Sequence, residues 1–135
     1  MVKYIISEAV MIIGLGTDLV ENERIKSLYL KYNSVFLNKV FSKHEIDYSF
    51  SKKEPYSHLA VRWAAKEAFW KALNTDKMLR PLWLEIVKSS VPEINILFSE
   101  LTEILEEKSV DKIHLSMSHE KLYSSSVVIL EGGLK

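Results

Sequence analysis

The sequence predicts a single α+β domain in which a long central helix packs on a mainly antiparallel sheet. Its length of 135 residues suits one ordinary domain and is too short for two. Residues 61–73 carry small apolar side chains at the 3.6-residue period of a helix. Residues 82–98 and 113–130 instead alternate apolar and polar side chains, as the strands of hairpins do. Helical and strand periods in separate stretches of one short chain are typical of the α+β class.

The first predicted strand is residues 11–16, MIIGLG, with Asp18 at its carboxyl end. Residues 1–10 before it form an extension that we expect to be dispensable, and Met11 offers an alternative start. Apolar residues at helical spacing after Glu21 predict a helix of roughly three turns. Asp18 and Glu21 then allow two interpretations, a capping box for that helix or a metal site, and capping is the more frequent of the two.

Two shorter elements separate this helix from the central one. Residues 35–41 are predicted to connect them, and Ser42–Glu45 has the signature of a capping box before a brief helix. That helix should end near Pro55, with residues 52–54 in a solvated turn.

The central helix, Tyr56–Leu73, is the element around which the rest is organised. One stripe of small side chains should let a neighbouring backbone approach closely, and its members are Val61, Ala64, Ala65, Ala68 and Ala72. Glu67 and Lys71 project from one edge of this stripe, four residues apart. His58, Arg62 and Lys66 lie on another side, where an exposed polar face is the simplest interpretation.

The last part of the chain predicts two hairpins and a helix. Strands near residues 82–87 and 94–98 should pair through a turn, and Ser99 should cap a helix whose four glutamates form a solvated face. A second hairpin follows over residues 113–130, with its turn at residues 119–121.

Composition excludes several classes of function. Lysine plus arginine equal aspartate plus glutamate, 18 against 18, so no overall basic charge indicates nucleic-acid binding. The chain has no cysteine, which removes disulfides, thiolate metal sites and a cysteine nucleophile. The opening residues lack the pattern of a signal peptide and are too short to span a membrane. We therefore expect a cytoplasmic protein without a nucleic-acid or membrane partner.

Three places could carry chemistry: Asp18 at a strand end, Glu67 with Lys71 on the central helix, and His119 after Ser116 and Ser118. Carboxylates from separate elements suit Mg²⁺, which takes one or two protein acids together with waters and substrate phosphates. Each place also has a plain structural interpretation, because Glu67 and Lys71 fit an ordinary helix-surface pair and His119 an ordinary turn residue. Only their combination points to Mg²⁺-assisted phosphoryl chemistry.

Three stretches also resemble, in order and separation, the motifs of a known family. IIGLGTDLVENERI (12–25), RWAAKEAFWKAL (62–73) and LSMSHEKLYSSSVVIL (115–130) are similar to those of the holo-acyl-carrier-protein synthases. These enzymes are the small trimeric group of 4′-phosphopantetheinyl transferases. The resemblance extends over nearly the whole chain from Met11, and it favours the metal interpretation of Asp18 over capping.

The resemblance implies transfer of the 4′-phosphopantetheine group of coenzyme A to a serine of an apo acyl-carrier protein, with release of adenosine 3′,5′-bisphosphate. Asp18 and Glu67 match the family's metal acids and would hold Mg²⁺ against the pyrophosphate. Lys71 matches a lysine that stabilises or protonates the departing phosphate. The resemblance leaves two candidates for the group that removes the serine proton, Glu67 and a metal-bound water.

The same resemblance assigns the binding residues and the assembly. Lys66 and His119, with Ser118 as a further candidate, match residues around the coenzyme A phosphates. Arg24, Lys26 and Lys31 match a basic first helix that meets the acidic carrier protein, although the family usually has more arginine there. The implied assembly is a homotrimer with its active sites between subunits.

The sequence departs from the family pattern in two further places, and it leaves other functions open. Asn74-Thr75-Asp76 replaces a glycine-rich turn, and the middle hairpin has a shortened turn. One alternative is a binding module for coenzyme A or a carrier protein that has the same fold but no turnover. Another is a Mg²⁺-dependent phosphohydrolase, which would release the adenosine product without a carrier.

Overall fold

Two antiparallel sheets surround one long helix in the computed structural model, which describes residues 10–88 and 90–133. The larger sheet has the strand order β1-β5-β4, and the smaller one is the β2–β3 hairpin. The strands are β1 (Val10–Glu21), β2 (Leu84–Lys88), β3 (Pro92–Ile96), β4 (Val110–His119) and β5 (Tyr123–Gly133). The predicted α+β class is therefore confirmed, with the strands divided between two sheets.

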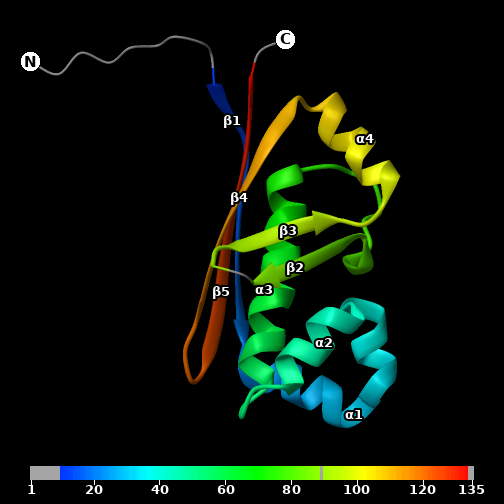
Figure 1. The fold of residues 1–135 in the computed structure, drawn as a ribbon, viewed down its shortest axis with the longest axis vertical. Coiled ribbons are helices and arrows are strands. Elements are labelled where there is room, and N and C mark those ends of the chain that lie inside the picture. Colours follow the sequence, from blue (N-terminus) through cyan, green and yellow to red (C-terminus); the bar gives the residue numbers. More distant parts are fainter. Residues whose placement is uncertain (1–9, 89, 134–135) are drawn as a thin grey trace, which may run out of the picture.

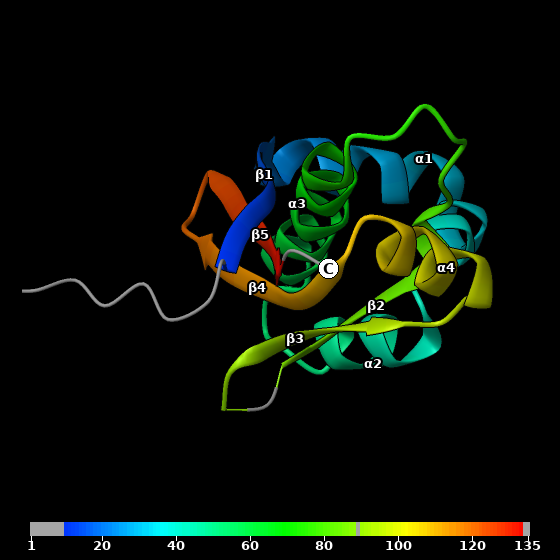
Figure 2. The same cartoon turned by 90° about the horizontal axis from the view of Figure 1, so that it is seen from above.

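The helices all lie on one side of the larger sheet (Figure 1). They are α1 (Asn22–Val40), α2 (Lys43–Phe50), α3 (Tyr56–Leu73) and α4 (Ser99–Glu107), and a short 3₁₀ helix, η1 (Pro81–Trp83), precedes β2. Seen from above, α3 stands at the centre, with the sheet along one side and the other elements around it (Figure 2). Its bounds are those predicted.

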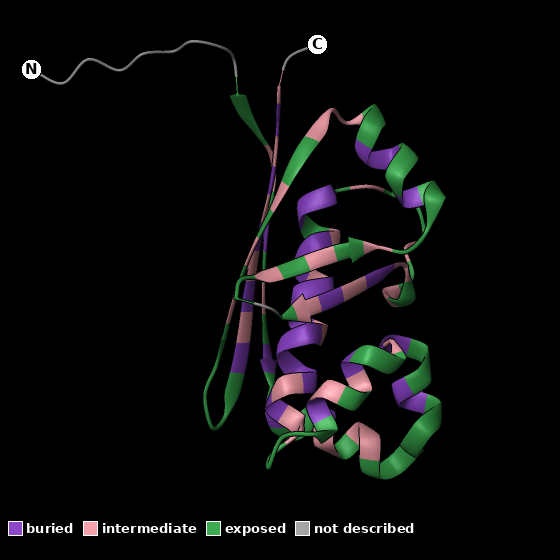
Figure 3. Cartoon of the chain, in the orientation of Figure 1, coloured by how far each residue is buried: buried purple, intermediate pink, exposed green. Residues whose placement is uncertain are grey.

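The stripe of small residues on α3 faces β1 and β5, as predicted. Val61, Ala64, Ala65, Ala68 and Ala72 are all buried, and α3 is buried along most of its length (Figure 3). Two glycines of β1 complete this contact. A Cβ atom at Gly14 would overlap the carbonyl oxygen of Ala72, and one at Gly16 would overlap that of Ala68. Glycine on the strand and alanine on the helix thus let two backbones touch.

We expect Gly16→Ala to destabilise the chain by at least about 1–3 kcal/mol, because the added methyl group meets a backbone atom that cannot rotate away. Urea unfolding measures the difference. Thr102→Ala on the exposed face of α4 is the control, with an expected change within about 0.5 kcal/mol. Equal stability of Gly16→Ala and the control would show that β1 and α3 are not in close contact.

Two hydrophobic clusters pack around α3. The first contains Phe69 and Leu73 of α3 with Leu84 of β2, Leu101 of α4 and Leu130 of β5. The second lies nearer the start of α3, where Leu59, Ala60 and Ala64 meet buried residues from the end of β1 and from α1, among them Val20, Ile25, Phe36 and Leu37. α3 contributes to both clusters, so its position fixes the elements on either side of it.

Several predicted details are wrong. Residues 35–40 are helical, because α1 continues to Val40 after a kink at Asn33, which has φ 52°. Asp18 does not cap α1: β1 runs on to Glu21, Glu21 is the residue before the helix, and its side chain makes no capping hydrogen bond. Ser99 is the first residue of α4 rather than its cap. The capping box of Ser42 and Glu45 is confirmed.

Asn74 replaces the glycine expected after α3. It adopts the left-handed conformation, with φ 48° and ψ 57°, and its N–H donates to the carbonyl oxygen of Trp70. Asparagine tolerates this conformation better than most residues other than glycine. The helix therefore ends as a glycine-terminated helix would, although a side chain is present.

The predicted extension falls mostly outside the part of the chain that the structure describes. Of the predicted extension 1–10, residues 1–9 lie outside the described residues, and Val10 pairs with Gly133 in the sheet. That the extension is dispensable stays a prediction. None of the helices among the described residues combines the length and apolar character needed to cross a membrane.

Candidate active site

The contact between β1 and α3 brings Asp18 and Lys71 together. The Nζ atom of Lys71 lies 3.0 Å from Oδ1 of Asp18 and donates a second hydrogen bond, also 3.0 Å long, to the carbonyl oxygen of Thr17. The Asp18 side chain is 16% exposed and that of Lys71 is 56% exposed. The pair therefore lies at the edge of the interface, where a ligand from solvent can reach it.

Glu67 is the second carboxylate of this site. Burial beside the stripe raises the pKa of Glu67, and the nearby Asp18 carboxylate raises it further, while Lys71 and Arg24 act in the opposite direction. The raised pKa reflects partial burial of the Glu67 carboxylate and, after that, the negative charge of Asp18 close to it. Lys71 offsets part of this cost, and a bound cation would offset more of it.

The donor set of this site fits Mg²⁺. Two carboxylates from separate elements leave room for waters and substrate oxygens, which is the usual protein share of a magnesium site. No group of three or more histidine, aspartate or glutamate side chains that could hold a metal occurs within residues 10–88 and 90–133. Asp18 and Glu67 are the residues that could contribute ligands, and Lys71 adds a positive charge for a phosphate.

The structure places Ser118 and His119 on opposite faces of the sheet. His119 is level with Ser124, whose hydroxyl donates to the carbonyl oxygen of Ser57 on α3, so His119 is on the α3 face. Successive strand residues alternate between faces, so Ser118 is on the outer face, level with Ser125. The sequence-predicted cluster of serines and histidine is thus divided, and His119 alone faces the α3 side.

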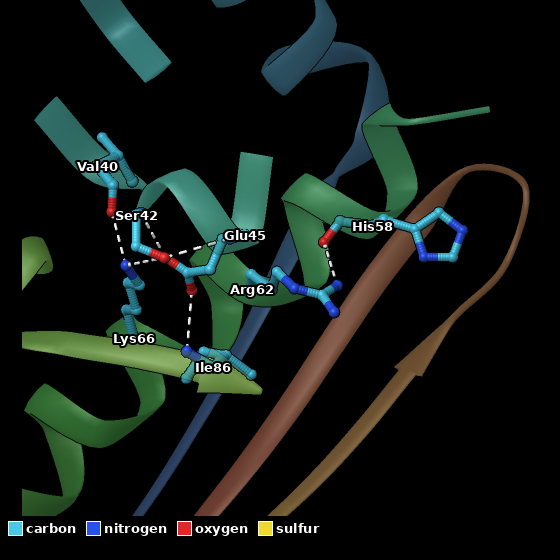
Figure 4. A network of polar contacts seen from close by, with 7 residues as sticks. All are labelled: Val40, Ser42, Glu45, His58, Arg62, Lys66 and Ile86. Atoms are coloured by element: carbon cyan, nitrogen blue, oxygen red, sulfur yellow. Dashed lines mark hydrogen bonds and ion pairs between the residues drawn. The ribbon is translucent and has the colours of Figure 1, made fainter. Parts of the chain in front are cut away.

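Lys66 does not occupy the position predicted from the family. It is 1% exposed, and its Nζ atom lies 2.7 Å from both Oε1 of Glu45 and the carbonyl oxygen of Val40 (Figure 4). Burial lowers the pKa of Lys66, and the Glu45 carboxylate opposes that change. An ammonium buried among protein groups does not reach a coenzyme phosphate in solvent. We therefore assign Lys66 a structural role.

Glu45 is the centre of this buried network. Its Oε1 accepts from the N–H of Ser42, and its Oε2 accepts from the N–H of Ile86, so one carboxylate joins α2, α3 and β2. Arg62, one turn before Lys66, is also 1% exposed. The interpretation of Arg62 and Lys66 as an exposed polar face is therefore wrong, because α2 covers that side of α3.

A pocket that the sequence did not predict lies beside α1, with a volume of about 360 Å³. Three lysines line it next to Tyr56: Lys26 of α1, Lys53 of the loop before α3 and Lys121 of the β4–β5 turn. Two carboxylate residues, Glu23 and Glu54, line it as well. The sequence placed Lys53 and Lys121 in two unrelated turns. No periodic pattern links two turns so far apart, so only the fold could bring them together.

Comparison with known proteins gives consistent matches. Residues 14–127 match a family model described as the 4′-phosphopantetheinyl transferase superfamily. A holo-[acyl-carrier-protein] synthase of Chlamydia muridarum is 46% identical over 87% of this chain and 94% of its own length. One from Thermodesulfovibrio yellowstonii is 43% identical over 89% of this chain and 99% of its own length.

Solved structures agree with these relatives. The holo-[acyl-carrier-protein] synthase of Neisseria meningitidis superposes with a TM-score of 0.80 and 31% identity, covering 89% of this chain and 98% of its own. The enzyme of the same name from Helicobacter pylori, solved in complex with coenzyme A, has a TM-score of 0.73 and 28% identity, covering 86% of this chain and 98% of its own.

Proposed function

Because the chain belongs to the 4′-phosphopantetheinyl transferase superfamily, we propose that its site at the β1–α3 contact carries out the reaction of that superfamily. The chain is a holo-[acyl-carrier-protein] synthase, which moves 4′-phosphopantetheine from coenzyme A to an acyl-carrier protein. The observation that carries the residue assignment is the convergence of Asp18, Glu67 and Lys71 at this contact.

Mg²⁺ is the proposed metal. Asp18 and Glu67 would hold it, and when bound it supplies a Lewis acid that neutralises negative charge on the pyrophosphate oxygens. The raised pKa of Glu67 supports this proposal, since burial and the nearby Asp18 carboxylate both disfavour its ionised form, which a bound cation would favour. Removing divalent metal with a chelator should stop transfer, and adding Mg²⁺ should restore it.

The chain's own residues have separate tasks in the proposed reaction. The serine hydroxyl of the carrier attacks the β-phosphorus. The bond between that phosphorus and the oxygen that it shares with the α-phosphate breaks, and adenosine 3′,5′-bisphosphate leaves. Lys71 faces this leaving phosphate, where its ammonium neutralises the new charge or donates a proton. Glu67 is a candidate to accept the serine proton, because a carboxylate of raised pKa is a stronger base than an exposed one.

The coenzyme phosphates are proposed to lie between the metal site and the pocket beside α1. His119 is retained from the sequence prediction, and Lys53 and Lys121 take the place that Lys66 leaves. Their ammonium groups come from two different turns, which suits a ligand with several anionic oxygens. Ser118 stays a weaker candidate, because it is on the outer face of the sheet.

A transfer assay tests the function. The chain, coenzyme A, Mg²⁺ and an apo acyl-carrier protein should give a carrier heavier by one phosphopantetheine group. Binding of coenzyme A or carrier without product, across fatty-acid and polyketide carriers, would instead indicate a module without turnover. Release of the adenosine product in the absence of a carrier would indicate a phosphohydrolase.

The carrier protein is proposed to dock on α1 through Arg24, Lys26 and Lys31. Charges of this kind speed the encounter with an acidic partner and fix its register. We expect Lys31→Glu to raise the KM for the carrier by about tenfold at low salt and to leave the KM for coenzyme A unchanged. The matched control is Lys39→Glu, exposed near the other end of the same helix. Equal effects of the two variants would remove α1 as the docking surface.

The assembly is proposed to be a homotrimer with active sites between subunits. The outer face of the larger sheet is not covered by any helix of the described chain, and it carries Leu15 and Leu19, which are 63% and 66% exposed, beside Val127 and Ile129 (Figure 1). An apolar sheet face of this kind is typical of an interface. Light scattering that finds a monomer at the concentration of the assay would contradict this proposal.

We also propose that the chain works in the cytoplasm, as the sequence analysis expects. The location is tested by fractionating the cells that express it. Recovery with the membrane pellet, rather than with the soluble fraction, would contradict it.

A further inference from the structure

A continuous row of ring contacts links the buried Arg62 to the exposed His119. The His119 and His58 rings meet edge to face, with their centroids 4.9 Å apart. The Tyr48 and His58 rings also meet edge to face, with their centroids 5.9 Å apart. The Arg62 guanidinium lies over the Tyr48 ring, 4.4 Å from its centroid. Side chains from α2, α3 and β4 are therefore linked in one row of contacts.

The inner end of this row is held in place by Arg62. Arg62 is 1% exposed, and its Nη1 donates a hydrogen bond of 3.0 Å to the carbonyl oxygen of His58 (Figure 4). The Arg62 Nε has no hydrogen-bond partner among the described residues. Leaving a buried guanidinium short of a hydrogen bond costs free energy of folding. The guanidinium of Arg62 lies against the Tyr48 ring, which in turn contacts the His58 ring. Arg62 and Tyr48 thus form a fixed support for the His58 ring.

His58 presents a neutral ring to His119. Burial lowers the pKa of His58, and the charges of His119, Arg62 and Lys52 lower it further, while Glu54 acts in the opposite direction. At neutral pH the His58 side chain therefore adds no positive charge beside His119. What it offers is an aromatic ring in close contact, which should restrict the rotation of the exposed His119 imidazole.

We propose that His58 is a positioning residue, whose ring holds the His119 imidazole in the orientation that meets a phosphate of the coenzyme. This proposal rests on the proposed function, because it takes His119 as a contact of coenzyme A. It extends that function to His58, which has no counterpart among the residues predicted from the sequence. The affinity that His58 contributes comes from ordering its neighbour in advance and requires no contact of its own with the ligand.

The test compares His58→Ala, His58→Leu and His58→Phe with the unaltered chain, using calorimetric titration with coenzyme A and with adenosine 3′,5′-bisphosphate. Loss of the ring should weaken binding about three- to tenfold, the range for freezing one mobile side chain, in the alanine and leucine variants alike. Phenylalanine, which keeps a flat ring and does not titrate, should restore binding to within about twofold. In the transfer assay the KM for coenzyme A should rise while kcat stays within about twofold.

Two further variants make the result specific. His44→Ala, which removes an exposed histidine of α2, should leave binding unchanged. The double variant His58→Ala/His119→Ala should bind no more weakly than His119→Ala alone, because His58 acts only through His119. Additive losses, a phenylalanine variant as weak as alanine, or a His58→Ala variant equal to the His44→Ala control would each overturn the proposal.

The role of His58 and the transferase function can be told apart by experiment. If the unaltered chain transfers phosphopantetheine and the His58 variants bind normally, only the positioning role is wrong. If the unaltered chain neither binds coenzyme A nor transfers the group, the proposed function is wrong, and the role of His58 is lost with it. The leucine variant keeps the comparison open should alanine destabilise α3.

Discussion

Replacement of Glu67 by glutamine is expected to lower transfer by about 10²–10³-fold or more while the folded chain remains at least as stable as before. Glutamine keeps the shape of the side chain and removes the charge that would hold Mg²⁺. The loss should appear in kcat/KM measured at saturating Mg²⁺, and extra Mg²⁺ should not restore it.

The stability result follows from the pKa of Glu67. Burial, and then Asp18, raise that pKa in the folded state above its value in the unfolded chain. Glu67 in the unfolded chain therefore loses its proton at a lower pH than in the folded chain. As the pH rises above the pKa of the unfolded state, ionisation of Glu67 favours unfolding, and the full cost is reached above the pKa of the folded state. A glutamine does not ionise, so at neutral pH the variant avoids this cost. Thermal unfolding without divalent metal should show an equal or higher Tm.

The matched control is Glu103→Gln on the exposed face of α4, which should change neither transfer nor Tm. With Mg²⁺ added, the unaltered chain should gain in Tm, and the Glu67 variant should gain less. A Glu67→Gln variant that retains full transfer, or one whose Tm rises with Mg²⁺ as much as that of the unaltered chain, would contradict the metal assignment.

Replacement of Lys66 by methionine is expected to destabilise the fold by about 3–5 kcal/mol, a fall in Tm of about 10–20 °C. Methionine fits the space of the lysine stem, so the cost is electrostatic. The variant leaves the Glu45 carboxylate, which is fully buried, without its ammonium partner at 2.7 Å, and it leaves the carbonyl oxygen of Val40 without its donor. Chemical denaturation at one fixed protein concentration measures the change.

A surface ion pair provides the control. Lys43 and Asp47 lie 3.3 Å apart, and their side chains are 91% and 63% exposed, so Lys43→Met should cost less than about 1 kcal/mol. The double variant Lys66→Met/Glu45→Gln should recover part of the stability, because no buried charge is then left alone. A stable Lys66→Met variant with weakened coenzyme A binding would return Lys66 to the role that the sequence predicted.

Local patterns in the sequence determined most of the elements. The bounds of α3 are the same in prediction and structure, because a proline precedes the helix and the stripe of alanines gives it a clear period. The capping box at Ser42 is equally local, since both of its hydrogen bonds join residues three apart. The kink at Asn33 is different. A residue with φ 52° inside a helical stretch leaves the apolar spacing on either side intact, so the pattern does not report it.

The chemistry of the candidate site was predictable, because the motifs in the sequence indicated Asp18, Glu67 and Lys71. Lys71 and Lys66 stand in the same motif, five residues apart, and helical spacing shows only that they face different ways. The tertiary structure decided what each one meets. β1 leaves the edge next to Lys71 open, whereas α2 covers Lys66 with the carboxylate of Glu45. A helical period tells which residues share a face, and only the packing of distant segments determines whether that face is covered by protein or by water.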